Sequence, residues 1–170
     1  MTAPHFVHLR LHSEFSIVDG TVRIDDGIAA AVADAMPALA VTDLANAFGL
    51  VKFYRAARAR GIKPIIGCDV WLTHEAERDQ PYRALLLAQS RAGYLRLSAW
   101  LTRAYRGNQH RGRAELKRDW FAEGTDGLIA LSGARDGEVG AALLQGNASG
   151  AAAASRSWSD LFPGRYYLEL

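Results

Sequence analysis

The fold of this chain is decided by the run Ala38-Leu39-Ala40-Val41-Thr42-Asp43. Five uncharged residues, four of them apolar, are followed at once by a carboxylate. A short apolar run of this kind is typical of a strand that is covered on both faces. Such strands occur in parallel sheets flanked by helices, so the run predicts an α/β protein with Asp43 at the carboxyl end of a strand.

Strand and helix patterns alternate on both sides of this run. The predicted strands are Phe6–Leu11, Ala38–Thr42, Ile62–Leu72, Ala84–Ala88, Leu128–Leu131 and Tyr166–Leu170. The predicted helices run from Asp25 or Asp26 to Met36, from Asn46 or a neighbour to Gly61, through Tyr94–Tyr105, and over Glu138–Leu144 and Ala148–Leu161. This alternation favours a parallel β/α sheet or barrel. Nothing follows the last strand to cover or pair it, so we expect a fragment of a longer chain.

The composition is that of a soluble globular domain. The chain has 170 residues, of which 49% are hydrophobic and 22% charged, and its 20 basic and 18 acidic residues give a net charge of +2. This balance argues against a charged tail for nucleic-acid binding. Cys68 is the single cysteine, and no apolar run reaches the roughly 18 residues that span a membrane. Because Met1–Pro4 also shows no secretion signal, we expect a cytoplasmic protein with no membrane partner.

Four polar side chains lie at or just beyond the predicted strand ends: His12, Asp19, Asp43 and Asp69. Reactive groups of parallel β/α folds gather at this edge, and one imidazole with three carboxylates could bind divalent metal ions. Ordinary structural roles fit the same residues. Asp19 could be a turn residue before Gly20, Asp43 a helix cap, and His12 a hydrogen-bonded loop residue. Spacing alone favours these structural roles.

The chain resembles a known family in blocks that follow one another from end to end. These blocks are Phe6-Val7-His8-Leu9-Arg10-Leu11-His12-Ser13-Glu14-Phe15-Ser16 with Asp19-Gly20, then 36–43, 49–54, 61–67, 86–88, 93–94, 127–133 and 162–170. They are similar to the polymerase and histidinol phosphatase (PHP) domain at the N-terminus of the bacterial replicative DNA polymerase III alpha subunit.

This resemblance implies an incomplete PHP-type β/α barrel. The family barrel has seven strands, and residues 1–170 would hold the first six, as the N-terminal part of a single PHP domain that is truncated before barrel closure. The parent protein would be a DNA-directed DNA polymerase, a nucleotidyltransferase of DNA replication. Its polymerase domains would lie beyond Leu170 and are absent here.

The metal site of the family is altered in this sequence. Active members hold zinc, manganese or magnesium ions that drive phosphoester hydrolysis. Four positions lack the family ligand. Arg10 and Leu44 each stand in place of a histidine, Arg83 stands where a histidine is often found, and Ala134 replaces a further ligand. Arginine has no free lone pair for a metal at neutral pH.

The resemblance therefore implies a vestigial site. His12, Asp19, Asp43 and Asp69 would remain, the last as a shortened replacement for glutamate. We expect no bound metal, no cofactor and no catalytic residue in this fragment. Arg10, together with Arg83, would supply the missing positive charge in a salt-bridge network with the aspartates.

The resemblance also implies a role for a PHP domain whose metal site is vestigial. In relatives with a degenerate site, the PHP domain is a docking platform for the proofreading exonuclease, epsilon. The implied partners are epsilon, the rest of the alpha chain and holoenzyme, and DNA through the parent protein. The alternative is a working phosphoesterase, a 3'-5' exonuclease or pyrophosphatase, that uses His12 and the three aspartates. A basic loop over Arg103–Arg118 could contact epsilon or DNA, although a solvated loop is the default expectation.

Overall fold

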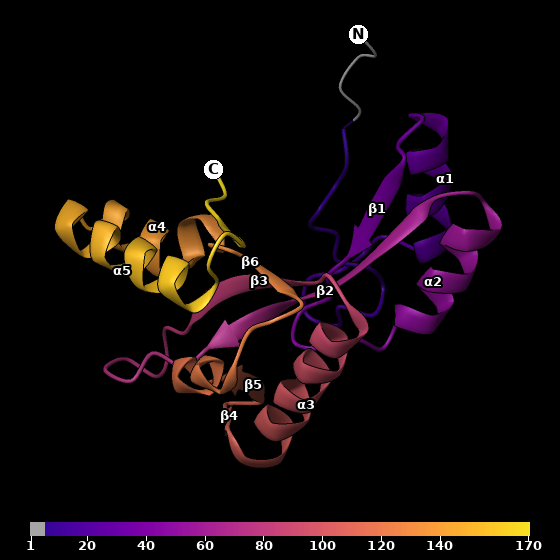
Figure 1. Cartoon of the computed structure of the whole chain (residues 1–170). Coiled ribbons are helices and arrows are strands. Elements are labelled where there is room, and N and C mark those ends of the chain that lie inside the picture. The colour runs from indigo at the N-terminus through magenta and orange to yellow at the C-terminus, as the bar shows by residue number, and fades with distance from the viewer. Residues whose placement is uncertain (1–5) are drawn as a thin grey trace, which may run out of the picture. The chain divides into compact units, whose positions relative to one another are not determined.

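The computed structural model describes residues 6–170, which form two compact units, one ending at Cys68 and one running from Asp69 to Leu170. The segment Met1–Pro4, in which no secretion signal was found, lies outside the described residues. Both units combine helices with strands of a mixed sheet (Figure 1).

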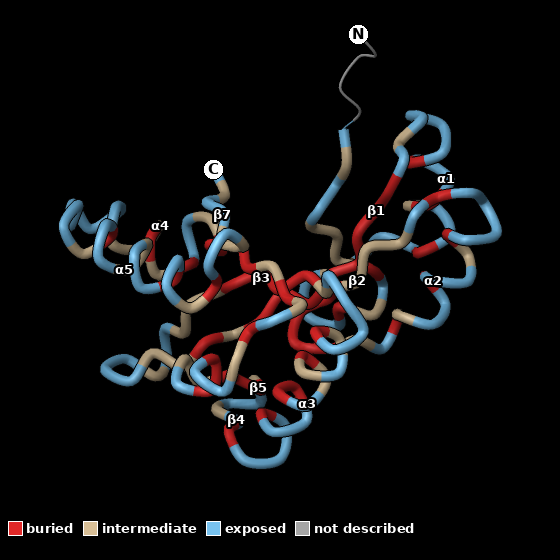
Figure 2. Tube along the Cα trace, viewed as in Figure 1, coloured by how far each residue is buried: buried red, intermediate tan, exposed pale blue. Residues whose placement is uncertain are grey.

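The first unit packs two helices against a parallel strand pair. Its elements are α1 (Ile24–Ala33), β1 (Ala38–Val41), α2 (Leu50–Ala59) and the first part of β2 (Lys63–Leu72). β1 runs parallel to β2 in the register Ala38↔Lys63 to Val41↔Ile66. All four residues of β1 are buried, as its apolar run predicts, and Figure 2 shows this strand in red. The core beneath it consists of Ile24, Ile28, Ala31, Leu39, Val41, Phe53, Ala57 and Ile62.

The second unit contains most of the sheet, in the order β4-β5-β2-β3-β6-β7. Its elements after β2 are β3 (Tyr82–Ala88), α3 (Arg91–Gly107), β4 (Gln109–His110), β5 (Arg113–Leu116), the 3-10 helix η1 (Arg118–Glu123), β6 (Leu128–Leu131), the 3-10 helix η2 (Ala134–Asp136), α4 (Glu138–Leu144), α5 (Ala148–Leu161) and β7 (Tyr166–Tyr167). The helices α4 and α5 lie side by side and agree with their predicted bounds (Figure 1).

Aromatic side chains form the core of the second unit. Phe121 lies at its centre, with ring centroids 5.0 Å from Trp100, 5.4 Å from Trp158 and 5.7 Å from Phe162. Each of these side chains is at least 95% buried. Such contacts give aromatic pairs about 0.5–1.5 kcal/mol beyond their burial, so the cluster fixes η1 against α3 and α5. Within residues 6–170, no helix is long and apolar enough to cross a membrane.

Two predictions about the sheet are wrong. Phe6–Leu11 does not form a regular strand, although the backbone N–H of Ala40 donates to the carbonyl of His8 at 3.0 Å. At the end of this segment the Leu11 N–H donates to the side-chain hydroxyl of Thr42 at 2.9 Å. The sheet is mixed rather than parallel, since β3 pairs antiparallel with β6. The chain therefore returns along β6 in the opposite direction, a feature that strand–helix alternation does not reveal.

The starts of the first two helices also differ from the prediction. Arg23, rather than Asp25 or Asp26, stands at the N-cap of α1, and its side chain makes no capping bond. α2 begins at Leu50 and not near Asn46. The Asn46 side chain instead holds the preceding turn, where Oδ1 accepts from the Phe48 N–H at 3.0 Å.

The segment Arg103–Arg118 is structured, so the expectation of a basic loop is wrong. It contains the last turn of α3 and the antiparallel hairpin β4–β5. The fully buried Glu115 accepts from Nε of Arg78 at 3.0 Å and lies 3.4 Å from Nε of Arg113. Some of the basic charge of this segment is therefore used inside the fold.

We expect Gly93→Ala to destabilise the second unit. A Cβ at position 93 would lie 1.8 Å from the carbonyl oxygen of Gly127, so α3 and the turn before β6 would have to separate. Overpacking of this kind costs about 1–3 kcal/mol. Gly107→Ala in the same helix is the matched control, because no atom lies within 4 Å of its added Cβ. Equal unfolding free energies for the two variants in urea would contradict this reading of the packing.

Candidate functional site

Asp43 is the most enclosed candidate residue of the first unit. It follows β1 and is only 2% exposed. The backbone N–H of Ser13 donates to Oδ1 at 2.6 Å, and the Ser13 hydroxyl donates to Oδ2 at 3.0 Å. Burial raises the pKa of Asp43 above its ordinary value, while the two hydrogen bonds from Ser13 act in the opposite direction. Both carboxylate oxygens are thus engaged by one residue.

His12 and Asp19 meet in the same unit. Nδ1 of His12 lies 2.9 Å from Oδ1 of Asp19, and the Ser16 hydroxyl donates to that same oxygen at 2.7 Å. The Ser16 oxygen in turn accepts from the backbone N–H of Leu44 at 2.9 Å. The charges of His12 and Asp19 also influence the pKa of Asp43, the imidazole lowering it and the carboxylate raising it. Three of the four predicted residues therefore form one neighbourhood.

The loop 13–20 is shaped by short polar residues that the sequence analysis did not select. The Ser16 backbone N–H donates to the carbonyl of Ser13 at 2.8 Å, and the Gly20 N–H donates to that of Ser16 at 2.7 Å. A Cβ at position 20 would lie 1.9 Å from the Ser13 carbonyl oxygen, so only glycine fits there. The signal that could have found these residues is the clustering of serine, aspartate and glycine that is typical of turns.

Asp69 lies in the second unit and is paired with Arg83. Its side chain has no exposed surface. Nε of Arg83 donates to Oδ1 at 3.0 Å and Nη2 donates to Oδ2 at 2.6 Å, so the guanidinium binds both oxygens. The same guanidinium lies 4.5 Å from the ring of Trp71, which covers it on one face. Arg83 thus neutralises a carboxylate at one of the predicted ligand positions.

The other positions that lack a family ligand are Leu44, Ala134 and Arg10. Leu44 is buried, and Cys68 is a buried residue, as predicted, whose thiol donates to the carbonyl of Asp43 at 3.2 Å. Ala134 opens η2 with a positive φ of 48° and carries no side chain that could bind a metal. Arg10 is partly buried in the first unit. Within residues 6–170, no three His, Cys, Asp or Glu side chains form a group that could hold a metal ion.

We expect Arg83→Met to destabilise the second unit strongly. The substitution keeps a long apolar stem but removes two charge-assisted hydrogen bonds from a fully buried carboxylate. Breaking a buried pair in this way costs about 3–5 kcal/mol. The double variant Asp69→Asn, Arg83→Met should recover part of that loss, because it removes the buried charge as well. Urea unfolding measures both, with Arg156→Met on the exposed side of α5 as the control. A loss no larger than that of the control would show that the pair contributes little.

The sequence of this chain is similar to DNA polymerase III alpha subunits along its whole length. It is 51% identical to the alpha subunit of Neisseria meningitidis over 174 residues, which cover 100% of this chain and 15% of that protein. It is 47% identical to the Pseudomonas aeruginosa subunit over 97% of this chain and 14% of that protein. For the Escherichia coli subunit the identity is 41%, over 100% of this chain and 15% of that protein. The chain therefore spans about 15% of the length of these relatives.

Solved structures show partial likenesses. An amidohydrolase from Chromobacterium violaceum aligns with 28% identity and a TM-score of 0.47, over 59% of this chain and 34% of that one. A protein from Bifidobacterium adolescentis named as a metal-dependent phosphoesterase aligns with 16% identity and a TM-score of 0.46, over the same shares.

The sequence profile of the PHP domain matches residues 8–170, which is nearly the whole chain. The mixed sheet and its helices are consistent with an incomplete β/α barrel of the PHP type. On this match and on the identities to DNA polymerase III alpha subunits, the chain belongs to the PHP domain family.

Proposed function

We propose that this chain is the first part of the PHP domain of a DNA polymerase III alpha subunit, and that it serves as a scaffold on which the proofreading exonuclease epsilon docks. The parent protein would be a DNA-directed DNA polymerase that acts in the cytoplasm with the rest of the holoenzyme. Its polymerase chemistry would lie outside residues 1–170. The identity to alpha subunits over the whole chain supports this assignment.

The observation that carries the scaffold role is the pairing of Asp69 with Arg83. Ligation of a metal ion requires lone pairs on carboxylate oxygens and imidazole nitrogens. Both oxygens of Asp69 already accept from Arg83, and both oxygens of Asp43 accept from Ser13. One nitrogen of His12 is engaged with Asp19. We infer that this donor set does not fit the metal cluster that family membership implies.

A guanidinium can replace the charge of a metal ion but not its chemistry. Arg83 neutralises a buried carboxylate through two hydrogen bonds, which stabilises the fold. It offers no open coordination position, cannot generate hydroxide from water at neutral pH, and cannot hold a phosphoryl oxygen as a Lewis acid. We propose that the guanidinium of Arg10 supplies further positive charge in the first unit. Hydrolysis of phosphoesters by this domain would then be lost, while its surface stays available to a partner.

We expect the purified epsilon exonuclease to bind the intact protein that carries this chain. Calorimetry or surface plasmon resonance measures the affinity, with a variant of the intact protein that lacks residues 1–170 as the control. Loss of binding in the truncated protein, with its remainder still folded, supports docking on this domain. Equal binding by the two proteins would contradict it.

The rival phosphoesterase is tested on the same intact protein. We expect no release of phosphate from pyrophosphate, and no shortening of a 5'-labelled oligonucleotide, with zinc, manganese or magnesium present. Hydrolysis by the wild-type protein that is lost in the Asp43→Asn and Asp69→Asn variants would establish the phosphoesterase instead. A contaminating nuclease or phosphatase would not respond to these changes.

A further inference from the structure

Acidic and basic residues are separated along the chain of the first unit. All six of its acidic residues lie at or before Asp43, and residues 44–68 contain no Asp or Glu. That segment of 25 residues holds five cations, which are Lys52, Arg55, Arg58, Arg60 and Lys63. The net charge of +2 for the whole chain therefore conceals a local concentration of positive charge.

Three of these cations form a row on helix α2. Lys52, Arg55 and Arg58 stand three residues apart, so their side chains lie on one face of the helix. Phe53 and Ala57 are buried on the opposite side, in the core of the first unit. All three cations of this basic row are exposed, and the row is about 9 Å long, because a helix rises about 1.5 Å per residue.

The basic row is only partly compensated by carboxylates. Nζ of Lys52 lies 2.7 Å from Oε1 of Glu14, so the charge at this end of the row is paired. Arg55 and Arg58 form no ion pair with a carboxylate of residues 6–170. These two guanidinium groups are therefore available to an anionic partner.

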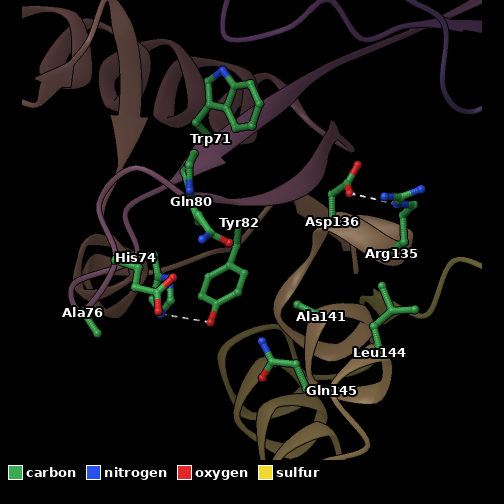
Figure 3. Close-up of a pocket in the computed structure, with 12 residues that line it drawn as sticks. Trp71, His74, Ala76, Gln80, Tyr82, Arg135, Asp136, Ala141, Leu144 and Gln145 are labelled. Atoms are coloured by element: carbon green, nitrogen blue, oxygen red, sulfur yellow. Dashed lines mark hydrogen bonds and ion pairs between the residues drawn. The ribbon is translucent and has the colours of Figure 1, made fainter.

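A groove in the second unit has the opposite charge. It encloses about 730 Å³ beside the β2–β3 loop and α4 (Figure 3). Glu77 and Asp136 bring carboxylates to its lining, and the guanidinium of Arg135 is already paired, with Nε 3.2 Å from Oδ1 of Asp136. A polyanion would meet net negative charge in this groove, so the basic row of α2 is the more favourable contact for it.

We propose that the basic row binds the phosphate backbone of duplex DNA. Duplex DNA carries one negative charge per about 1.7 Å of its axis, so a row of about 9 Å would meet several phosphates, whereas an acidic protein segment has a lower charge density. Guanidinium groups donate charge-assisted hydrogen bonds to phosphate oxygens. The half-exposed Tyr54 adds a hydroxyl donor one helical turn before Arg58.

This contact would hold DNA without reading its sequence, because phosphates carry no sequence information. The choice of DNA rests on the proposed parent polymerase, whereas docking of epsilon plays no part in it. In the intact protein the basic row would add to the affinity that the polymerase domains supply.

The salt dependence of DNA binding tests the inference on the intact protein. Fluorescence anisotropy of a labelled duplex measures the affinity over a range of salt concentrations. We expect the double variant Arg55→Ala, Arg58→Ala to bind about tenfold more weakly at about 0.1 M salt, with the slope of log K against log salt reduced by about 2, since two phosphate contacts are lost. The matched control Arg91→Ala, Arg156→Ala removes the same charge from exposed positions of the second unit and should bind within about twofold of wild type.

A charge-preserving variant separates a DNA contact from a loss of folding. Arg55→Lys, Arg58→Lys should keep the wild-type slope, and a slope as low as that of the alanine variant would overturn the inference.

The remaining outcomes separate this inference from the proposed function. Equal slopes for the alanine variant and its control would overturn the inference and leave the polymerase assignment standing. If the wild-type protein does not bind duplex DNA at all, the assignment fails and the inference fails with it. An alanine variant that binds duplex DNA as wild type does but loses binding to poly-glutamate would assign the basic row to an acidic protein, which also overturns the inference.

Discussion

The negative charge of a fully buried carboxylate must be neutralised by neighbouring groups, and in this chain Asp69, in the middle of β2, is such a carboxylate. Arg83 on β3 meets it with two hydrogen bonds, and Trp71 covers the guanidinium. The pair ties together two neighbouring strands of the sheet. A single unpaired charge at this depth would cost several kcal/mol, which is a large fraction of the stability of a small domain.

In the first unit, neutral hydrogen-bond donors stabilise the buried carboxylate of Asp43. Asp43 receives a backbone N–H and a hydroxyl from Ser13, and its pKa remains raised because burial outweighs these bonds. The position of Ser13 depends on the tight loop that Gly20 closes. In both units, then, the buried carboxylate, Asp43 after β1 and Asp69 within β2, has hydrogen-bond donors from the protein itself. If these bonds persist in the intact protein, a metal ion would have to displace them before it could bind, and that competition is the physical basis of the scaffold that we propose.

Local patterns allowed much of the fold to be predicted. β1, α4 and α5 follow from apolar runs and helical spacing. Apart from β4, β5 and the two 3-10 helices η1 and η2, the second half of the chain has the predicted element order. The antiparallel pairing of β3 with β6 could not be predicted, because strand direction depends on how the chain returns in space and not on the strand residues. The hairpin β4–β5 was missed although Arg111-Gly112, with positive φ at both residues, is the kind of two-residue turn that a hairpin needs.

The candidate residues were found more readily than their partners. His12, Asp19 and Asp43 were selected from their places at strand ends, and the structure brings them to one neighbourhood. Arg83 was named as a source of positive charge for the aspartates, but the sequence did not say which aspartate it would meet; the structure pairs it with Asp69, on a separate strand.

The most direct test of the central claim, that ion pairs and hydrogen bonds occupy the place of a metal cluster, is the metal content of the intact protein. Elemental analysis after purification, followed by calorimetric titration with zinc and manganese, measures it, beside an Arg10→His, Leu44→His, Arg83→His variant that restores imidazoles. We expect no stoichiometric metal in the wild-type protein and measurable binding in the variant. One or more metal ions per wild-type chain, bound with micromolar affinity or better through this domain, would contradict the claim.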